Sequence, residues 1–184
     1  MSPERTRARS SSPEVTIRRI SDRDRDGYRA LRLRALKADP LAFGSTWSRE
    51  SAYEEVRWTE WTHRGATSSE AATWLAESAE SELVGMAGIF WEKGSFAVWG
   101  MWVDPRRRGT GIGTRLLQEV LRWAATARPE ASVRLSVNPT QSAAVRLYRT
   151  CGFRSTGKSD PLGHTPGAFV EEMVRPSQGS RTSA

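Results

Sequence analysis

The chain has 184 residues, enough for one domain with polar tails, and a formal net charge of +7 with an isoelectric point of about 10.4. Its one cysteine, Cys151, excludes an intrachain disulfide and favours a reducing compartment, so we expect a cytoplasmic protein. The longest apolar run, Leu83–Trp91, is far shorter than the ~20 residues of a membrane helix, and the basic N-terminus lacks the apolar stretch of a secretory signal.

The positive charge has two interpretations. A nucleic-acid or acidic membrane partner would explain it. The interpretation we favour is a heavy use of arginine throughout the chain, because several arginines fall in the expected tails and aromatic residues do not alternate with arginines as in a base-stacking surface. We therefore expect no specific nucleic acid and no membrane as partners.

The N-terminal part predicts a strand and two helices. Alternating apolar residues over Val15–Ile20 favour a strand, and Asp22 or Asp24 can cap the helix that follows. Asp39-Pro40 ends that helix, and after a loop a second helix is predicted over Glu50–His63. Residues 1–13 and 176–184 have no apolar periodicity and are expected to be disordered tails of a domain spanning 14–175.

Three strands are predicted in the middle of the chain. They cover Ala72–Ala76, Leu83–Trp91 and Ser95–Val103. The acidic residues 77–82 form the first connection, and Lys93-Gly94 forms a tight turn between the last two strands. These short connections predict neighbouring antiparallel strands.

The C-terminal part alternates helices and strands. Ile112, Leu116, Leu117, Val120, Leu121 and Ala124 fall on one helical face. A strand over Val133–Val137 and a short helix over Ala143–Tyr148, ended by Gly152, come next. Two strands, Phe153–Lys158 and Ala168–Val174, complete an order that indicates a mixed sheet with helices on both faces.

The segment between the strand at 95–103 and the next helix carries the strongest functional signal. It reads Val-Asp-Pro-Arg-Arg-Arg-Gly-Thr-Gly-Ile-Gly-Thr over residues 103–114. Glycines let a backbone turn tightly and approach a ligand, and a helix start offers unpaired N–H groups with partial positive charge. The segment therefore predicts a site for a pyrophosphate.

Two common phosphate-binding motifs do not fit this segment. A Walker A loop needs Lys followed by Ser or Thr after its last glycine, whereas Gly113 is followed by Thr114 and Arg115. The dinucleotide motif G-x-G-x-x-G fails at its third glycine. Glycines at such spacing also occur in ordinary strand-to-helix turns, so their spacing alone settles nothing.

A more specific pattern is Arg108-x-x-Gly111-x-Gly113, which resembles the acetyl-CoA signature R/Q-x-x-G-x-G/A of the GNAT family of N-acetyltransferases. Residues 138–153 also resemble the strand-helix-strand segment of that family, which ends in L-Y-x-x-x-G-F. Close resemblance covers residues 83–158. It implies a GNAT-type α/β (α+β) fold, with a central, mostly antiparallel mixed sheet and helices on both faces.

The resemblance also implies the reaction and its cosubstrate. It implies direct transfer of acetyl from acetyl-CoA to a primary amine in a ternary complex, with no metal. The CoA pyrophosphate would lie on the backbone N–H groups of residues 108–114, and the pantetheine arm would lie beside a splayed fourth strand. The cofactor-binding residues implied are Met101, Trp102, Val103, Arg108, Gly109, Thr110, Gly111, Ile112, Gly113, Thr114, Asn138 and Gln141.

Within this set some roles stay open. The Arg108 side chain would add charge to the phosphate site, while Arg106 and Arg107 would meet the 3′-phosphate or solvent. Many family members have Asn where Gln141 stands, and Asn138 lies three residues earlier, so either is a candidate to bond the pantetheine amide.

Tyr148 stands where the family has its general acid. A phenol with a pKa of about 10 can protonate a departing thiolate. The alternative is that Tyr148 packs in the fold, with its hydroxyl bonded to the CoA sulfur.

The strand at 95–103 lacks the glutamate that many family members use as general base. An alkyl amine with a pKa of about 10.4 must still lose a proton before it attacks. A water chain, Glu92, Glu50 and Glu54 remain as candidates.

The acceptor amine is expected between the N-terminal helices and the C-terminal loop, in residues 39–64 and 159–168. Phe43, Trp47, Trp58 and Trp61 crowd the first of these segments, either as pocket lining or, more often for tryptophan, as core. The histidines His63 and His164 lack metal-ligand spacing and are expected at the surface. Cys151 has no neighbouring base and is not expected to be a nucleophile.

The acceptor is thus a small molecule or peptide, and a homodimer is an assembly that the resemblance implies. The alternative to the enzyme is a non-catalytic acyl-CoA-binding or sensor protein, since the base residue is missing.

Overall fold

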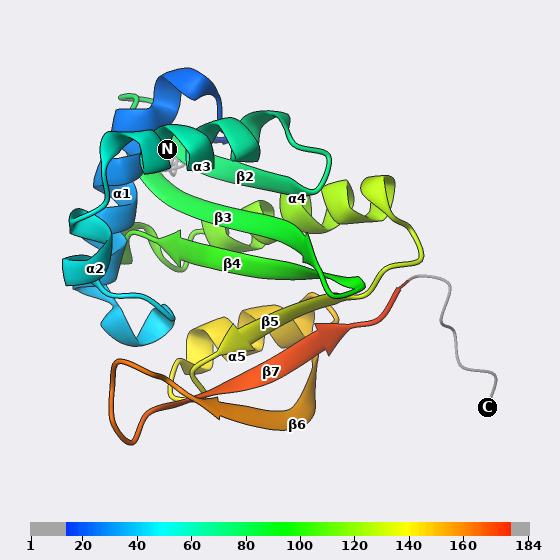
Figure 1. Cartoon of the computed structure of the whole chain (residues 1–184). Coiled ribbons are helices and arrows are strands. Elements are labelled where there is room, and N and C mark those ends of the chain that lie inside the picture. The colour runs from blue at the N-terminus through cyan, green and yellow to red at the C-terminus, as the bar shows by residue number, and fades with distance from the viewer. Residues whose placement is uncertain (1–13, 178–184) are drawn as a thin grey trace, which may run out of the picture.

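The computed structural model describes residues 14–177 as a seven-stranded sheet with helices on both faces (Figure 1). The strand order is β1-β2-β3-β4-β5-β7-β6, and β4 and β5 form the one parallel pair within those residues. This confirms the predicted fold class. Of the tails expected at 1–13 and 176–184, residues 1–13 and 178–184 lie outside the described residues.

The elements follow the predicted order with one more helix. The strands are β1 (Val15–Arg19), β2 (Ala71–Ser78), β3 (Leu83–Glu92), β4 (Ser95–Val103), β5 (Val133–Val137), β6 (Arg154–Pro161) and β7 (Phe169–Arg175). The helices are α1 (Arg25–Ala38), α2 (Trp47–Ser51), α3 (Glu55–Thr67), α4 (Ile112–Ala127) and α5 (Ser142–Thr150). Short 3₁₀ turns cover Asp22–Asp24, Pro40–Ala42 and Pro105–Arg107.

The prediction of one helix over Glu50–His63 is wrong, because the structure has two helices there. The Thr46 hydroxyl accepts from the Arg49 N–H, and α2 starts at Trp47, three residues earlier than predicted. Glu54 then adopts an extended conformation and breaks the chain before α3. The two helices can therefore take different directions, and α2 bends back along α1.

Two apolar clusters flank the sheet. On one face α4 and α5 cover a cluster that includes Ile89, Leu116 and Phe153. On the other face α1 and α3 cover a cluster that includes Leu36, Trp58 and Met86. The strands alternate between these clusters, as expected for a sheet with both faces buried.

The sheet opens between β4 and β5. These strands pair only at Phe96 with Val133 and at Ala97 with Arg134, near the start of β4. A β-bulge in β4, where Gly100 has φ +61°, lies opposite the pairing shift between Met86 and Gly88 of β3 and bends the strand. Figure 1 shows β5, β7 and β6 diverging from the other four strands. The later part of β4 is thus left with one unpaired edge.

Candidate active site

The predicted pyrophosphate site is a strand-to-helix connection with free N–H groups. After the turn at Pro105–Arg107, Gly109 has φ +77° and Gly111 has φ +85°, and α4 begins at Ile112. The Arg115 N–H donates to the Gly111 carbonyl as the first helical hydrogen bond. The N–H groups of residues 112–114 precede that bond and have no partner within the helix, so they are available to an anion.

The glycines leave room for a ligand over this turn. A Cβ atom added to Gly109 or Gly111 would meet no atom within 4 Å, so any side chain there would project into open space in front of the N–H groups. Gly113 differs, because a Cβ there would lie 3.3 Å from Leu147 of α5. The first two glycines leave the predicted phosphate site open, and the third lets α4 pack against α5.

The arginines before the glycines are mostly engaged with carboxylates. Arg108 donates to Asp39 at 2.5 Å and to the Val103 carbonyl at 3.0 Å, so its side chain fixes the end of β4 to the end of α1. Its expected role as a phosphate charge stays a prediction, since the side chain is 47% exposed and Nη1 takes part in neither bond. Arg106 donates to Asp104 and lowers the pKa of that carboxyl.

Arg107 differs from the other two, because its side chain forms no ion pair with a carboxylate of the described residues. It lines a hollow of about 360 Å³ together with Arg106, Thr110, Ile112 and Arg115. Ile112 is itself buried, and the Thr110 hydroxyl donates to the Arg107 carbonyl, so these two residues can offer only backbone groups as donors in this hollow. The hollow is thus lined by three arginines, Arg106, Arg107 and Arg115, and by one carboxylate, that of Glu14.

The last residues of β4 turn backbone groups toward the opening. The Asp104 N–H donates to the Val84 carbonyl, and Trp102 pairs with Met86 in the same register. Because an antiparallel strand alternates its hydrogen-bonding direction, the N–H groups of Met101 and Val103 point away from β3. The indole of Trp102 is buried against α1 and donates to Asp39. Its side chain therefore fixes β4 to α1 and does not enter the opening.

The two amide side chains considered for the pantetheine arm have different surroundings. Asn138 is buried, and its Oδ1 accepts from the N–H and the hydroxyl of Thr140, which fixes the turn after β5. Gln141 is half-buried at the start of α5 and makes no capping hydrogen bond. Asn138 can thus offer its amide N–H, whereas Gln141 has both amide atoms free of local bonds.

Tyr148 lies on α5 at the other side of the opening from β4. It is 7% exposed and packs edge-on against Phe153 with ring centroids 5.9 Å apart. Burial raises the pKa of its phenol to about 12. Its hydroxyl makes no hydrogen bond to any residue from 14 to 177, and the oxygen is not completely buried. The group is a protonated donor at neutral pH.

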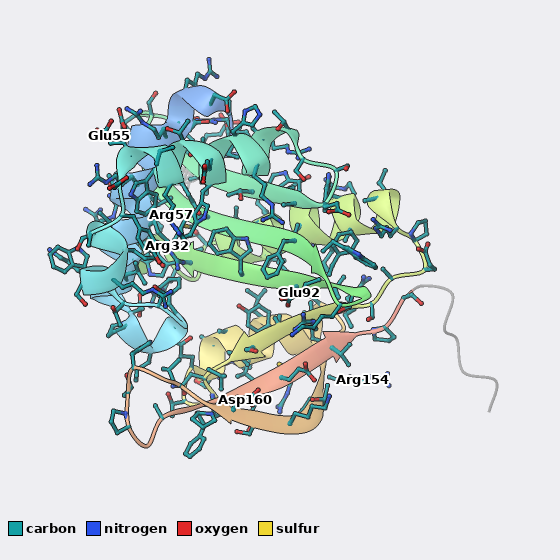
Figure 2. The ribbon with its side chains drawn as sticks, viewed as in Figure 1. Arg32, Glu55, Arg57, Glu92, Arg154 and Asp160 are labelled. Atoms are coloured by element: carbon teal, nitrogen blue, oxygen red, sulfur yellow. The ribbon has the colours of Figure 1, made fainter. Side chains whose placement is uncertain are left out.

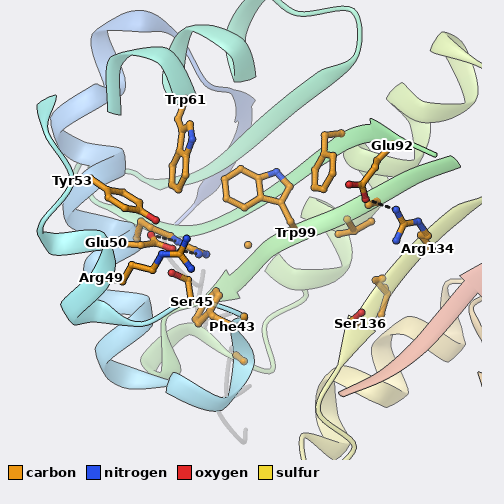
Figure 3. Close-up of a pocket in the computed structure, with 18 of the residues that line it drawn as sticks. Phe43, Ser45, Arg49, Glu50, Tyr53, Trp61, Glu92, Trp99, Arg134 and Ser136 are labelled. Atoms are coloured by element: carbon orange, nitrogen blue, oxygen red, sulfur yellow. Dashed lines mark hydrogen bonds and ion pairs between the residues drawn. The ribbon is translucent and has the colours of Figure 1, made fainter. Parts of the chain in front are cut away.

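A pocket of about 490 Å³ lies between the sheet and the N-terminal helices (Figure 3). Its walls come from β4 and β5 at the opening, from α2 and α3, and from the loop after α1. Arg49, Glu50 and Tyr53 lie at one end, and Glu92 and Arg134 lie at the other, where they form an ion pair of 2.6 Å. The pocket therefore joins the first expected acceptor segment, residues 39–64, to the opening beside β4, whereas no residue of 159–168 lines it.

The three carboxylates considered as general bases have different surroundings in the structure. Glu50 is 1% exposed and accepts two hydrogen bonds from Arg32, at 2.9 and 2.7 Å, so its oxygens are already occupied. Glu54 is exposed and does not line the pocket. Glu92 lines the pocket and is bound to Arg134. Of the three, Glu92 remains the candidate.

The aromatic residues of this region divide between pocket and core. Trp58 is 1% exposed and belongs to the core, whereas Trp61 and Phe43 line the pocket. Trp47 is 41% exposed and lies under the ammonium of Lys37. Sequence reasoning missed Trp99 of β4, whose ring contacts Trp61 and covers Gly88 so closely that an added Cβ at Gly88 would lie 2.3 Å from the indole nitrogen.

Of the two histidines expected at the surface, His63 is exposed, as predicted. His164 is half-buried, because its Nε2 donates to the Phe43 carbonyl at 2.7 Å. Cys151 is half-buried, and burial raises the pKa of its thiol, which disfavours a nucleophilic thiolate.

Arg32 is a pocket residue that the sequence analysis did not single out. It is 4% exposed and lies on the buried face of α1 with Tyr28, Leu31 and Leu36 (Figure 2). The signal was present, because a charged residue at helical spacing among apolar ones must find a buried partner. The partner, Glu50, lies in a helix that was predicted with the wrong start.

Among the described residues no group of three His, Cys, Asp or Glu side chains is placed to hold a metal. In the same part of the chain, no helix has the length and apolar character needed to cross a bilayer.

Comparisons with known proteins agree with this geometry. A model of the acetyltransferase (GNAT) family matches residues 32–153. Over 75 residues the chain is 39% identical to the N-alpha-acetyltransferase RimI of Mycobacterium tuberculosis, a match that covers 41% of this chain and 45% of that protein. The matches to three curated relatives span 20% to 59% of the length of those relatives.

Solved structures share the fold. A GNAT-family acetyltransferase from Streptococcus pneumoniae superposes with a TM-score of 0.75 at 22% identity, over 89% of this chain and 99% of that one. The protein yncA of Salmonella typhimurium, solved with acetyl-CoA, gives a TM-score of 0.74 at 15% identity, over 93% and 98% of the two chains. At these identities the similarity shows a common fold.

Proposed function

Because the chain belongs to the acetyltransferase (GNAT) family, we propose that it is an acetyl-CoA-dependent N-acetyltransferase that acts on a primary amine of a small molecule or peptide. The observation that carries this proposal is the continuity of three features. An open turn with free N–H groups leads to an unpaired edge of β4, and that edge borders a pocket of about 490 Å³. A phosphate-bearing arm and an amine acceptor can thus meet at β4.

The residues that would hold acetyl-CoA follow from the same geometry. The N–H groups of residues 112–114 at the start of α4 would bind the pyrophosphate. The N–H groups of Met101 and Val103 would bind the pantetheine arm and the thioester oxygen, with the amide of Asn138 or Gln141 on the opposite side. When bound, acetyl-CoA supplies a thioester carbonyl that an amine can attack.

The chain contributes electrostatic stabilisation and proton donation. A β4 N–H aimed at the carbonyl oxygen stabilises the negative charge that develops there, in the manner of an oxyanion hole. Tyr148 donates from its hydroxyl to the departing sulfur. Because its pKa is about 12, the hydroxyl keeps its proton in the resting protein and donates as charge builds on the sulfur.

The acceptor amine must be neutral when it attacks. Glu92 is the pocket carboxylate that we propose as the proton acceptor, directly or through water, because Glu50 is sealed by Arg32. The names of relatives support an amine acceptor in general, since RimI is an N-alpha-acetyltransferase and YjaB of Salmonella typhimurium is a peptidyl-lysine N-acetyltransferase. We propose a cytoplasmic location, since the chain has a single cysteine.

The first experiment is calorimetry with acetyl-CoA, CoA and ATP. We expect micromolar binding of acetyl-CoA and CoA and no binding of ATP, because the site is built for an arm as well as a pyrophosphate. Absence of binding to both CoA forms would overturn the proposal. Binding without transfer to any member of a wide amine panel would favour a non-catalytic acyl-CoA-binding protein.

A further inference from the structure

Arg32 is a buried cation, and one of its three guanidinium nitrogens has no hydrogen-bond partner. Its Nε and Nη2 donate to the two oxygens of Glu50, whereas Nη1 is fully buried and has no hydrogen-bond partner. An unpaired N–H group of a guanidinium is costly to bury, so we expect a water or a ligand atom to accept from it. Arg32 also lines the pocket of about 490 Å³.

The surroundings of Arg32 fix the direction of this free group. The guanidinium lies over the ring of Phe43 at 4.6 Å and over that of Trp99 at 5.5 Å. Its Nη1 would lie 3.3 Å from a Cβ added to Gly100, the residue at the bulge of β4. The free N–H groups therefore lie beside the bulge of β4, which comes directly before the edge residues Met101–Val103.

A second unpaired polar group lies in the same pocket. The hydroxyl of Ser45 is fully buried and has no hydrogen-bond partner. Arg49 and Arg57 line the pocket as well, and neither forms an ion pair with a carboxylate of the described residues. Figure 3 shows Ser45 and Arg49 beside Glu50, at the end of the pocket opposite Glu92.

The charge of the pocket is positive at this end. Four arginines and three glutamates line the whole pocket. Arg32 pairs with Glu50, and Arg134 pairs with Glu92. Glu172 pairs at 3.7 Å with Lys158, a residue that does not line the pocket. Arg49 and Arg57 thus remain uncompensated next to the two unpaired donors.

We propose that the acceptor carries a carboxylate, which binds Arg32 Nη1 and the Ser45 hydroxyl, so that the substrate class is the free amino acid. This inference rests on the proposed acetyltransferase function. A carboxylate has two oxygens that can accept from a guanidinium and a hydroxyl, and its charge offsets the positive end of the pocket. A polyamine would instead place a second cation against the arginines, which costs affinity.

The first test compares amines that differ only in the carboxylate. L-Phenylalanine and L-methionine are assayed against their α-amides, with spermidine as a polyamine, in the presence of saturating acetyl-CoA. We expect kcat/KM for the acids to exceed that for the amides by about 10- to 100-fold, the usual range for a hydrogen bond to a charged group. The α-amine of an amide is less basic than that of the acid, so more of it is neutral and able to attack at the assay pH. A higher kcat/KM for the acid therefore reports binding of the carboxylate and not amine reactivity.

Variants locate the carboxylate site. Ser45→Ala removes one donor and leaves the ion pair intact, and the double variant Arg32→Gln/Glu50→Gln removes both charges while keeping a hydrogen-bonding pair. Each is expected to reduce kcat/KM for the acids about tenfold or more and to leave the amides unchanged. Arg122→Gln on the outer face of α4 removes one arginine outside the pocket and should leave both substrate classes unchanged.

A titration that needs no turnover separates this inference from the proposed function. N-Acetyl-L-phenylalanine and its amide are added to the CoA-bound protein while tryptophan fluorescence is followed, since Trp99 lies against Arg32. Saturable binding of the acid, lost in the double variant, supports the carboxylate site. Equal behaviour of acid and amide in this titration overturns the inference, whether or not acetyl transfer occurs. Transfer to amides and polyamines with no effect of Ser45→Ala overturns it and leaves the acetyltransferase proposal standing.

Discussion

His164 donates a hydrogen bond from Nε2 to the backbone carbonyl of Phe43 at 2.7 Å. A carbonyl can only accept, so Nε2 carries the proton, and in the neutral ring Nδ1 accepts from the Thr165 hydroxyl at 2.9 Å. This contact joins the loop between β6 and β7 to the loop between α1 and α2. Phe43 in turn lies under Arg32, so the distant loop supports one wall of the pocket.

Replacing His164 by alanine should loosen that wall. We expect the KM for the acceptor to rise several-fold with little change in the dissociation constant of acetyl-CoA, because the cofactor turn lies elsewhere. His63→Ala serves as the matched control, since His63 is exposed and bound only to Asp22. Equal effects of the two variants on acceptor KM would contradict a role for the His164 contact.

Tyr148→Phe should lower turnover without lowering cofactor affinity. The variant keeps the ring against Phe153 and removes only the donor, so we expect kcat to fall about 10²- to 10⁴-fold. Calorimetry with acetyl-CoA should give a wild-type dissociation constant. Tyr28→Phe is the control, because Tyr28 is another buried tyrosine, with its pKa also raised to about 12 by burial. Unchanged turnover in the Tyr148 variant would remove this residue from the chemistry.

Gly111→Ala should reduce acetyl-CoA affinity more than its strain explains. Alanine at φ +85° costs roughly 1–2 kcal/mol of stability, and its methyl group would project into the phosphate site. Gly94→Ala imposes the same strain at φ +79° with equally open surroundings, but in the turn between β3 and β4. Denaturant unfolding should show similar losses for both, whereas calorimetry should show weaker binding for Gly111→Ala alone. Normal binding by Gly111→Ala would refute the phosphate assignment.

Asp24 should make the protein sensitive to acid. Hydrogen bonds from Arg18, followed by those from Ser21, lower the pKa of Asp24 to about 2, against an ordinary value of 3.8. The folded state therefore binds this proton less readily than the unfolded state, so the contribution is complete above pH ~4 and disappears as the pH falls toward 2.

The variant Asp24→Asn isolates this contribution. At pH 7 it should lose on the order of 1–2 kcal/mol of the free energy of unfolding in guanidinium chloride, while near pH 2 it should match the wild type. Asp22→Asn is a suitable control, because Asp22 is exposed and bound only to His63. A stability difference for Asp24→Asn that does not change with pH would contradict the electrostatic origin.

The elements that the sequence predicted well are those whose signals are local. The turn at Lys93-Gly94 and the apolar face from Ile112 to Ala124 each identify an element within a few residues of its observed bounds. The helix predicted over Glu50–His63 failed because the Thr46 cap and the break at Glu54 are weaker signals than the surrounding helical spacing.

Sequence analysis proposed the glycine turn and Tyr148 as parts of the candidate site, but it missed Arg32 and the pairing of Arg32 with Glu50. The glycines at 109–113 and Tyr148 lie in short motifs whose chemistry depends on local backbone and helix position. Arg32 and Glu50 lie 18 residues apart on different helices, and nothing in their local sequence indicates that they face each other. Glu50 was therefore considered as a base, although its partner had already occupied both oxygens.

By itself, the sequence determined the strands, all helices but one, the glycine turn at 109–113 and the family, because period, glycine spacing and helix starts are properties of neighbouring residues. Only the tertiary structure decided which charges are free. Arg108 is taken by Asp39 and Glu50 by Arg32, while Arg32 Nη1 and the Ser45 hydroxyl are left without partners. Burial and pairing depend on residues far apart in the chain, and they set what the pocket can bind.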